Sequence, residues 1–328
     1  MTVTIKDIAE TANVSIATVS RVLANKEGFY SEKTAAKVRQ AAEKLGYRKN
    51  TAAVELVTQR SKVIGVIVSA TKTNFANDII AGIQDEAFKH NLSVIILYAG
   101  ESDPNQQHRA LQTVIERSVM GILILAIRPV DDDIAMLRAA NIPHLFLSTS
   151  FDSQNLPFIA SDDFRIGYQA TDFLIKKGHK KIGIAAIDRH TYIGTQRVLG
   201  YQRAMADHDL STKPAWIQDG HFTYDDGIEA MKTFGAKPEL DAVIGTSDLA
   251  AIGVMNQAET FGLNVPTDLA IMSIDGTQMV KIVRPQITSV TQSFYEMGSR
   301  GMKMMLQRDM TKFESQYTPF RIDEREST

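Results

Sequence analysis

The chain has 328 residues, a length typical of two domains, and its 44% hydrophobic and 23% charged residues exclude the disordered and fibrous classes. No apolar run reaches the ~20 residues that span a bilayer, and the absence of cysteine excludes disulfides and thiolate chemistry. The first residues lack the basic and apolar parts of an export signal. We therefore expect a cytoplasmic protein that does not associate with a membrane.

Charge is unevenly distributed along the chain. Residues 1–60 hold ten basic and six acidic side chains, a net charge of +4, whereas the rest of the chain carries a net charge of −6. A basic segment ahead of an acidic body favours an anionic partner for that segment. An ordinary solvated surface can produce the same imbalance, so charge alone does not decide the function.

Three short helices are predicted in the first 46 residues. Thr4 and Asp7 have the spacing of a capping box, and Asn13 is suited to end the first helix. Ser15 is suited to cap a second helix over residues 16–23, and Ser31 a third that ends before Gly46. Two short helices joined by a tight turn and closed by a third are typical of a helix-turn-helix domain.

The exposed face of the second helix predicts contact with DNA. An Ala or Thr methyl group can meet a thymine methyl, and Arg21 can form two hydrogen bonds to guanine or reach a phosphate. A plain three-helix cap with a polar face would explain most of the pattern equally well. Ile16 favours the DNA interpretation, because an apolar side chain exposed at a helix start needs an apolar partner.

The segment after this domain predicts a hinge. Residues 51–57 follow a potential cap, Asn50, and are too few to be helical alone in water. Leu56 has no core within the segment, so it could insert between base pairs in the minor groove. The alternative is a linker with one stray apolar residue.

The rest of the chain alternates between strand and helix patterns, which predicts an α/β fold with two doubly wound parallel sheets. We place one half at about residues 62–160 with 292–328 crossing over to it, and the other at about residues 161–291. In chain order, the expected strands are residues 63–69, 92–99, 121–126, 144–148, 181–187, 215–218, 242–246 and 270–275. The expected helices are residues 77–90, 104–118, 131–140, 164–177, 195–207, 225–234 and 249–261.

A cleft between the two halves is the expected ligand site, because ligands bind beyond the carboxyl ends of parallel strands. Most polar residues at those ends are equally well explained as loop residues or helix caps. Arg197 and Asp275 are more specific, because a guanidinium and a carboxylate can together bind the hydroxyl groups of a sugar. The candidates from strand ends and helix starts are Ser69, Ser148, Asp162, Arg197, Ser247, Asp248 and Asp275.

Two N-terminal stretches, residues 4–10 (TIKDIAE) and 14–23 (VSIATVSRVL), resemble the lactose-repressor family of bacterial transcription regulators. Later stretches are similar to the same family, so the resemblance covers essentially the whole chain. They are residues 31–34 (SEKT), 45–48 (LGYR), 177–182 (KGHKKI), 197–201 (RVLGY), 247–251 (SDLAA) and 283–290 (VRPQITSV). The resemblance implies a homodimer that binds a palindromic operator in double-stranded DNA, and a body like a periplasmic binding protein that senses a small metabolite.

The resemblance also implies which residues act. It places Ile16, Ala17 and Arg21 at base-reading positions, Leu56 with Ala53 at the minor-groove lever, and Gln292 and Phe294 at or near a crossover strand. The full DNA-binding set is Thr4, Ser15, Ile16, Ala17, Thr18, Ser20, Arg21, Asn25, Tyr47, Asn50, Ala53 and Leu56. The full effector-binding set is Ser69, Phe75, Ser148, Asp162, Arg197, Phe222, Ser247, Asp275 and Gln292.

Four positions depart from the family pattern. Lys49 stands where proline usually precedes the hinge, and Glu55 adds an acid to the hinge. Ser148 replaces a common Asp, and Ser247 replaces an Asn that usually contacts the ligand, which predicts an atypical effector. A response to a phosphorylated carrier protein, instead of or beside a small molecule, stays open.

Other function classes fit the sequence less well. We find no glycine-rich phosphate loop, nucleophile elbow or zinc-protease motif, and therefore expect no enzyme, no catalytic residue, no cofactor and no metal. Asp162 and Asp275 could form an acid–base pair, but a ligand site needs the same residues. The basic head argues against a transport-type binding protein, and the acidic body excludes nonspecific DNA compaction.

The lack of a leucine-heptad tail after Ile322 favours a dimer over a tetramer.

Overall fold

The computed structural model describes residues 3–25, 28–47, 61–69, 74–100, 103–151 and 156–328. The chain divides into two compact units, residues 1–61 and residues 62–328. Within the described residues, no helix is both long enough and apolar enough to cross a membrane.

The first unit contains the three predicted helices, α1 (Ile5–Ala12), α2 (Ile16–Leu23) and α3 (Glu32–Lys44). Thr4 and Asp7 form the capping box of α1, and Asn13 ends this helix in the left-handed conformation with φ of 51°. Ser15 and Ser31 cap the other two helices. The helices enclose a small core that includes Ile8, Ala9, Val19, Val22 and Val38.

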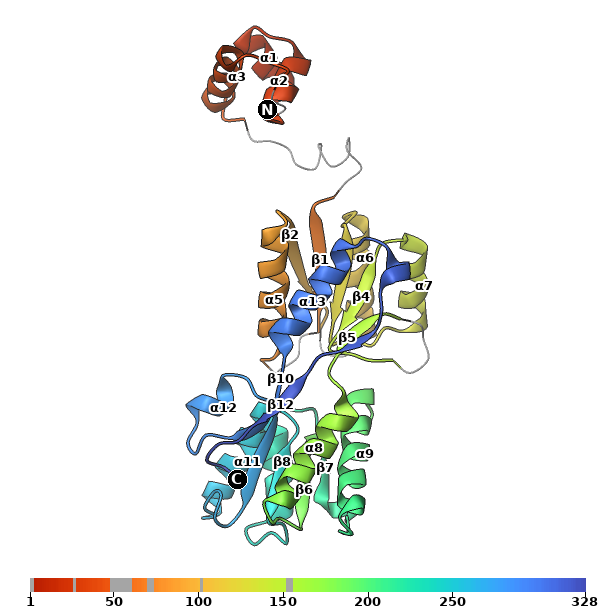
Figure 1. Ribbon diagram of the computed structural model, residues 1–328, viewed down its shortest axis with the longest axis vertical. Coiled ribbons are helices and arrows are strands. Elements are labelled where there is room, and N and C mark those ends of the chain that lie inside the picture. The colour runs from red at the N-terminus through yellow and green to blue at the C-terminus, as the bar shows by residue number, and fades with distance from the viewer. Residues whose placement is uncertain (1–2, 26–27, 48–60, 70–73, 101–102, 152–155) are drawn as a thin grey trace. The chain divides into compact units, whose positions relative to one another are not determined.

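The second unit contains two six-stranded sheets, which confirms the predicted α/β class (Figure 1). The first sheet has the order β11-β5-β4-β3-β1-β2 and is parallel throughout. Its strands are β1 (Val63–Val68), β2 (Ser93–Tyr98), β3 (Gly121–Leu125), β4 (His144–Leu147), β5 (Phe158–Ala160) and β11 (Gln316–Tyr317). Successive side chains of its strands point to opposite faces of the sheet, and each face packs into a separate hydrophobic core.

Helices cover both faces of this first sheet. Helices α5 (Ala76–Lys89) and α13 (Phe294–Leu306) share one core with it, whereas α6 (Pro104–Glu116) and α7 (Asp131–Ala140) share the other (Figure 1). We had not predicted α13, which packs closely on α5. A side chain in place of Gly298 would bring its Cβ to 2.0 Å from the carbonyl oxygen of Ile79, so this approach requires glycine.

The second sheet repeats the winding of the first, with the order β12-β10-β9-β8-β6-β7. Its strands are β6 (Ile182–Ile187), β7 (Ile217–Asp219), β8 (Ala242–Gly245), β9 (Ala270–Asp275), β10 (Thr288–Gln292) and β12 (Phe320–Asp323). Its helices are α8 (Asp163–Lys176), α9 (Tyr192–Asp207), α10 (Tyr224–Phe234), α11 (Asp248–Thr260) and α12 (Met279–Ile282). The strand expected at residues 215–218 begins later, because Pro214 starts the 3-10 turn η1 (Pro214–Trp216).

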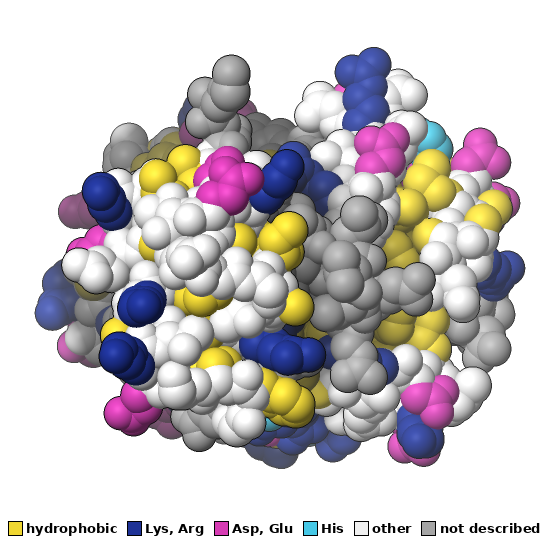
Figure 2. All heavy atoms as spheres, turned by 90° about the horizontal axis from the view of Figure 1, so that it is seen from above, with side chains coloured by type: hydrophobic (Ala, Val, Ile, Leu, Met, Phe, Trp, Pro, Cys, Tyr) yellow, Lys and Arg dark blue, Asp and Glu magenta, His cyan; other side chains and the backbone are white. Residues whose placement is uncertain are grey.

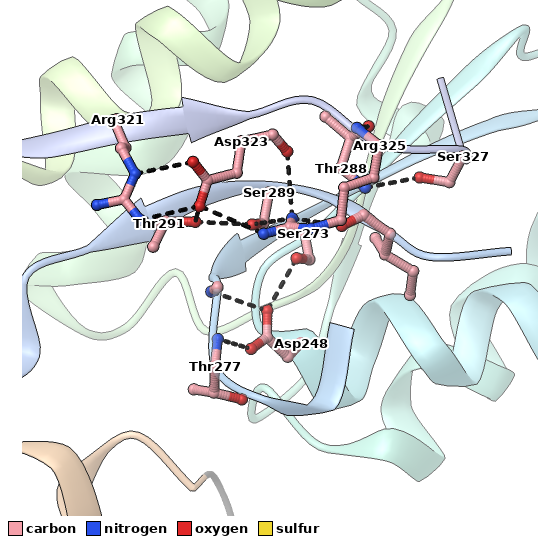
Figure 3. A network of polar contacts seen from close by, with 12 residues as sticks. Asp248, Ser273, Thr277, Thr288, Ser289, Thr291, Arg321, Asp323, Arg325 and Ser327 are labelled. Carbon is pink, nitrogen blue, oxygen red and sulfur yellow. Dashed lines mark hydrogen bonds and ion pairs between the residues drawn. The ribbon is translucent and has the colours of Figure 1, made fainter. Parts of the chain in front are cut away.

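The chain end returns to the second sheet, so our assignment of all of residues 292–328 to the first half is wrong. After α13, the 3-10 turn η2 (Met310–Lys312) and β11, strand β12 pairs antiparallel with β10. The reason is chemical: β10 carries buried hydroxyl groups that need partners. Thr291 donates to Asp323 at 2.8 Å, and Arg325 donates to Ser289 and to the carbonyl of Ile287, both at 2.8 Å (Figure 3).

Candidate functional site

Helix α2 presents a mixed apolar and polar surface to solvent. Ile16 is 53% exposed, although large apolar side chains are normally buried, and Ala17, Ser20 and Arg21 are also exposed. The helix is held from below by Val19 and Val22, which are fully buried. An exposed apolar side chain beside an exposed arginine can contact both base edges and phosphates. Figure 2 shows one face of the whole molecule, on which Lys and Arg side chains lie among hydrophobic ones.

Some of the other predicted DNA-binding residues form local contacts within the domain. The hydroxyl of Ser15 accepts from the backbone N–H of Thr18 at 3.1 Å, and Thr4 donates its backbone N–H to Asp7 at 2.7 Å. Asn25 is exposed in a left-handed turn after α2, and Tyr47 packs partly against the core. The remaining predictions here, Asn50, Ala53 and Leu56, together with Lys49 and Glu55, lie outside the described residues.

One exposed aromatic residue of this unit was missed by the sequence analysis. Phe29 lies in the turn between α2 and α3 and is 64% exposed. The guanidinium carbon of Arg21 lies over its ring at 5.3 Å from the centroid. A large aromatic residue outside the periodic pattern of both flanking helices was the signal available in the sequence.

In the second unit, Arg197 is buried in the second turn of α9. Its Nε donates to Asp163 Oδ1 at 2.9 Å, its Nη1 donates to the carbonyl oxygen of Thr246 at 2.8 Å, and its guanidinium lies 5.9 Å from the centroid of the Phe222 ring. Burial raises the pKa of Asp163, and the positive charge of Arg197 opposes this effect. Asp163 was not among the predicted site residues, because only its neighbour Asp162 was placed at the strand end.

Asp275 ends β9 and lies close to this ion pair. It is buried, its φ is 115°, and its Oδ1 accepts from Gln292 Nε2 at 2.8 Å. Burial raises the pKa of Asp275 well above its usual range, and the nearby charge of Asp248 adds to the effect, whereas Arg197 and Gln292 oppose it. The structure therefore brings together three of the predicted effector residues, Arg197, Asp275 and Gln292.

Asp248 supports the turn that follows Asp275. It accepts from Ser273 Oγ at 2.8 Å and from the backbone N–H groups of Gly276 at 3.1 Å and Thr277 at 2.6 Å (Figure 3). Burial raises its pKa, and these hydrogen bonds act in the opposite direction. With both oxygens engaged, Asp248 holds the loop in place more than it offers a ligand contact.

Two further candidates act as helix caps. Ser247 caps α11 by accepting from the N–H of Ala250 at 3.0 Å, and it donates to the carbonyl oxygen of Phe222 at 2.6 Å. Phe222 has a left-handed backbone with φ of 63°, and this hydrogen bond engages its carbonyl oxygen. Asp162 caps α8 by accepting from the N–H of Arg165 at 3.0 Å.

The candidates of the first half follow its strands. Ser69 follows β1 and donates its N–H to the carbonyl of Leu125, and Ser148 follows β4 with φ of 56°. The Phe75 ring lies 5.2 Å from that of Phe294. A small cavity is lined by residues of both halves, which are Asn74, Ser247, Asp248, Leu249, Asp275, Thr277 and Met279.

A second contact joins the halves at Arg128, whose guanidinium lies 5.5 Å from the Phe151 centroid and 5.8 Å from that of Tyr192. Within the described part of the chain, no group of three or more His, Asp or Glu side chains could hold a metal ion.

Two family models match this chain. Residues 4–50 match the bacterial regulatory proteins of the lacI family, and residues 61–322 match the periplasmic binding proteins and sugar binding domain of the LacI family. The chain belongs to the LacI family. It is therefore a DNA-binding transcription regulator with a sugar-binding type of body, and the relatives below are transcription regulators.

Three relatives of this LacI-family regulator illustrate the match. Catabolite control protein A of Priestia megaterium is 32% identical over the full length of both chains. A transcription regulator from Lactobacillus plantarum is 43% identical, with a TM-score of 0.75 over 81% of this chain and 98% of that one. The lac repressor dimer bound to operator and the anti-inducer ONPF is 26% identical, with a TM-score of 0.88 over 100% of this chain and 99% of that one.

Proposed function

We propose that this protein is a homodimeric repressor of a carbon-source operon, which binds a palindromic operator and is controlled by a sugar or a related metabolite. Residues 1–48 would bind DNA, residues 49–61 would form the hinge, and residues 62–328 would bind the effector and dimerise. As a regulator that reads the chromosome, it would act in the cytoplasm. The observation that carries the proposal is the surface of α2, where Ile16 and Arg21 are exposed on a capped, well-packed helix.

The effector site that we propose surrounds Arg197 and Asp275. Among the described residues, Arg197 donates one N–H to Asp163 and one to the carbonyl oxygen of Thr246. A guanidinium has five N–H donors, so three are left for a ligand. Asp275 keeps a second carboxylate oxygen beside them, since Gln292 occupies Oδ1. A donor and an acceptor held side by side suit the hydroxyl pairs of a sugar, and Phe222 offers an apolar face to the sugar ring.

Exposed apolar side chains support a homodimer. Phe88 at the end of α5 is 83% exposed, Tyr98 on the edge strand β2 is 70% exposed, and Ile282 on α12 is 68% exposed. A partner surface needs exposed apolar side chains that lie together in a patch, and these three residues are the candidates that we propose for it. A two-fold dimer presents two copies of α2, which is what a palindromic operator requires.

The hinge adds a second proposal about DNA. Leu56 would enter the minor groove between base pairs, and the hinge would become helical only when bound to DNA. Leu56→Ala should then lose its preference for operator over random DNA but keep weak, salt-sensitive binding to phosphates. A variant with the wild-type ratio of the two affinities, measured in a salt titration, would show that Leu56 does not act in this way.

A catabolite-control regulator is the second candidate, because a protein named catabolite control protein A matches the whole chain. Such a regulator would respond to a phosphorylated carrier protein. Adding the phosphorylated and unphosphorylated carrier to a binding assay separates the two mechanisms: only this candidate predicts that the phosphorylated form raises operator affinity.

A gel-shift assay with the DNA upstream of the protein's own gene tests the proposed function. We expect retarded complexes at protein concentrations at which a shuffled duplex of equal length stays free. A thermal-shift screen of sugars, sugar phosphates and nucleobases then identifies the effector, which should also change the retarded fraction. Ligand binding without any specific retardation would favour a sugar-binding protein, and turnover of the ligand would favour an enzyme on the same α/β body.

A further inference from the structure

The turn between α2 and α3 carries an aromatic side chain that the core does not use. Tyr30 packs partly against the helices, and Ser31 caps α3, so the chain on one side of Phe29 is fixed. On the other side, Gly28 has φ of 85°, a conformation that glycine adopts without strain. The backbone thus directs Phe29 outward, where 64% of the residue is exposed.

The partner of this exposed ring is Arg21, in the last turn of α2. The guanidinium carbon lies 5.3 Å from the ring centroid, within the range of a cation–π contact. A guanidinium that lies on a ring uses its flat face, and its N–H groups project in the plane and stay available. Among the described residues, no side chain or backbone group forms a hydrogen bond or ion pair with Arg21, so none of them occupies its donors.

We propose that Phe29 is a positioning residue for Arg21, which holds the guanidinium in place for hydrogen bonding to a base. The inference rests on the proposed function, because it needs a DNA sequence that the protein prefers. An arginine side chain loses much rotational freedom when it binds a base edge. A ring that already restricts the side chain in the free protein removes part of this loss. Phe29 therefore acts on sequence preference through Arg21.

A direct contact between Phe29 and DNA is the competing explanation. An exposed aromatic ring could itself pack against a sugar or a thymine methyl group. The two explanations differ in one respect: a positioning residue matters only while Arg21 is present, whereas a direct contact keeps its effect without Arg21. A double-mutant cycle measures this difference.

The experiment uses the full-length chain and a duplex enriched from a random-sequence library by the wild-type protein. Equilibrium binding to this duplex and to random DNA is measured for wild type, Phe29→Ala, Arg21→Ala and the double variant. Phe29→Tyr keeps an aromatic ring, and Phe29→Leu keeps an apolar side chain without one. Arg39→Ala removes an exposed positive charge of α3 as a matched control.

We expect Phe29→Ala to weaken binding to the enriched duplex about two- to fivefold, the range of an exposed cation–π contact. The affinity of Phe29→Ala for random DNA should change little. Phe29→Tyr should bind the enriched duplex as tightly as wild type, whereas Phe29→Leu should bind it as weakly as Phe29→Ala. In the Arg21→Ala background, Phe29→Ala should have no further effect. Arg39→Ala should weaken binding to both DNAs alike. Thermal unfolding of each variant, followed by circular dichroism, should match that of wild type.

Several results would overturn the inference. If Phe29→Ala lowers affinity for the enriched duplex equally with and without Arg21, Phe29 contacts DNA directly. If Phe29→Leu binds this duplex with wild-type affinity, the aromatic ring is not needed. If Phe29→Ala melts at a temperature low enough to leave part of the protein unfolded in the binding assay, and this explains the weaker binding, Phe29 has a structural role. If the wild-type protein enriches no sequence at all, the proposed function itself fails, which is a different outcome from a failure of the cycle.

Discussion

Replacing Arg197 by alanine should destabilise the second unit as well as remove an effector contact. Arg197 and Asp163 are each 8% exposed at the side chain and form an ion pair of 2.9 Å. Removing one partner of a buried pair leaves an uncompensated charge, which typically costs about 3–5 kcal/mol. That is a large part of the stability of a domain, usually about 5–15 kcal/mol. Arg197→Ala is therefore a poor test of ligand binding unless its folding is measured first.

The sign of the pH dependence provides an internal check. Burial raises the pKa of Asp163 in the folded protein, and Arg197 lowers it, so loss of Arg197 raises this pKa further. A group with a raised folded pKa contributes stability at low pH that is lost as pH rises through that pKa. The loss of stability caused by Arg197→Ala should therefore become smaller on acidification. The double variant Arg197→Ala/Asp163→Asn lacks the buried charge, so at neutral pH it should regain more than half of the stability lost in Arg197→Ala.

Urea unfolding followed by tryptophan fluorescence measures these effects. The chain has a single tryptophan, Trp216, which is buried in the core of the second sheet. At pH 7, we expect the urea midpoint of Arg197→Ala to lie clearly below that of wild type. At pH 5, the difference in midpoint between Arg197→Ala and the double variant should be smaller than at pH 7. An unchanged midpoint, or a double variant less stable than the single one at pH 7, would refute the reasoning.

Three more predictions concern Asp275, Arg21 and Tyr98. Asp275→Asn should raise the free energy of unfolding at pH 7, because burial raises the pKa of Asp275 in the folded protein and makes its ionised form unfavourable. The gain in stability should vanish on acidification, and urea titrations that show a loss of stability at pH 7 would contradict the prediction. Arg21→Ala should weaken operator binding about tenfold or more, as expected for a lost arginine–guanine contact, with unchanged circular dichroism; wild-type affinity in a gel shift would refute it. Tyr98→Asp should raise the dissociation constant of the dimer at least about tenfold, since it places a charge in the proposed interface. Sedimentation that shows an intact dimer would exclude Tyr98 from the interface.

Local rules predicted the small helical unit well, because its boundaries are set by neighbouring residues. Thr4, Ser15 and Ser31 each cap the helix that the sequence assigns to them, and Asn13 ends α1 in the expected left-handed turn. These effects act over three or four residues, so they are visible in the sequence. Eight strands and seven helices of the body were also visible from their periodicity. The strands β5, β10, β11 and β12 and the helices α12 and α13 were not predicted.

Features decided by distant contacts were not predicted. The helix α13 contains Gly298 and Gly301, which lower its helix propensity, and Gly298 is required only by the close approach of α5. The return of β12 depends on hydroxyl groups of β10 more than 30 residues away. In the site, Ser and Asp at strand ends suit both a ligand contact and a helix cap, and only the structure shows the caps made by Asp162 and Ser247.

The most direct test of the central claim is selection of DNA from a random duplex library by the full-length protein. A homodimer with two copies of α2 predicts enrichment of an inverted repeat whose half-sites are centred about 10–10.5 base pairs, or a multiple of that, apart. It also predicts at least about a thousandfold preference for the enriched duplex over random DNA near physiological salt. Enrichment of a single half-site, or equal affinity for enriched and random DNA, would contradict the account.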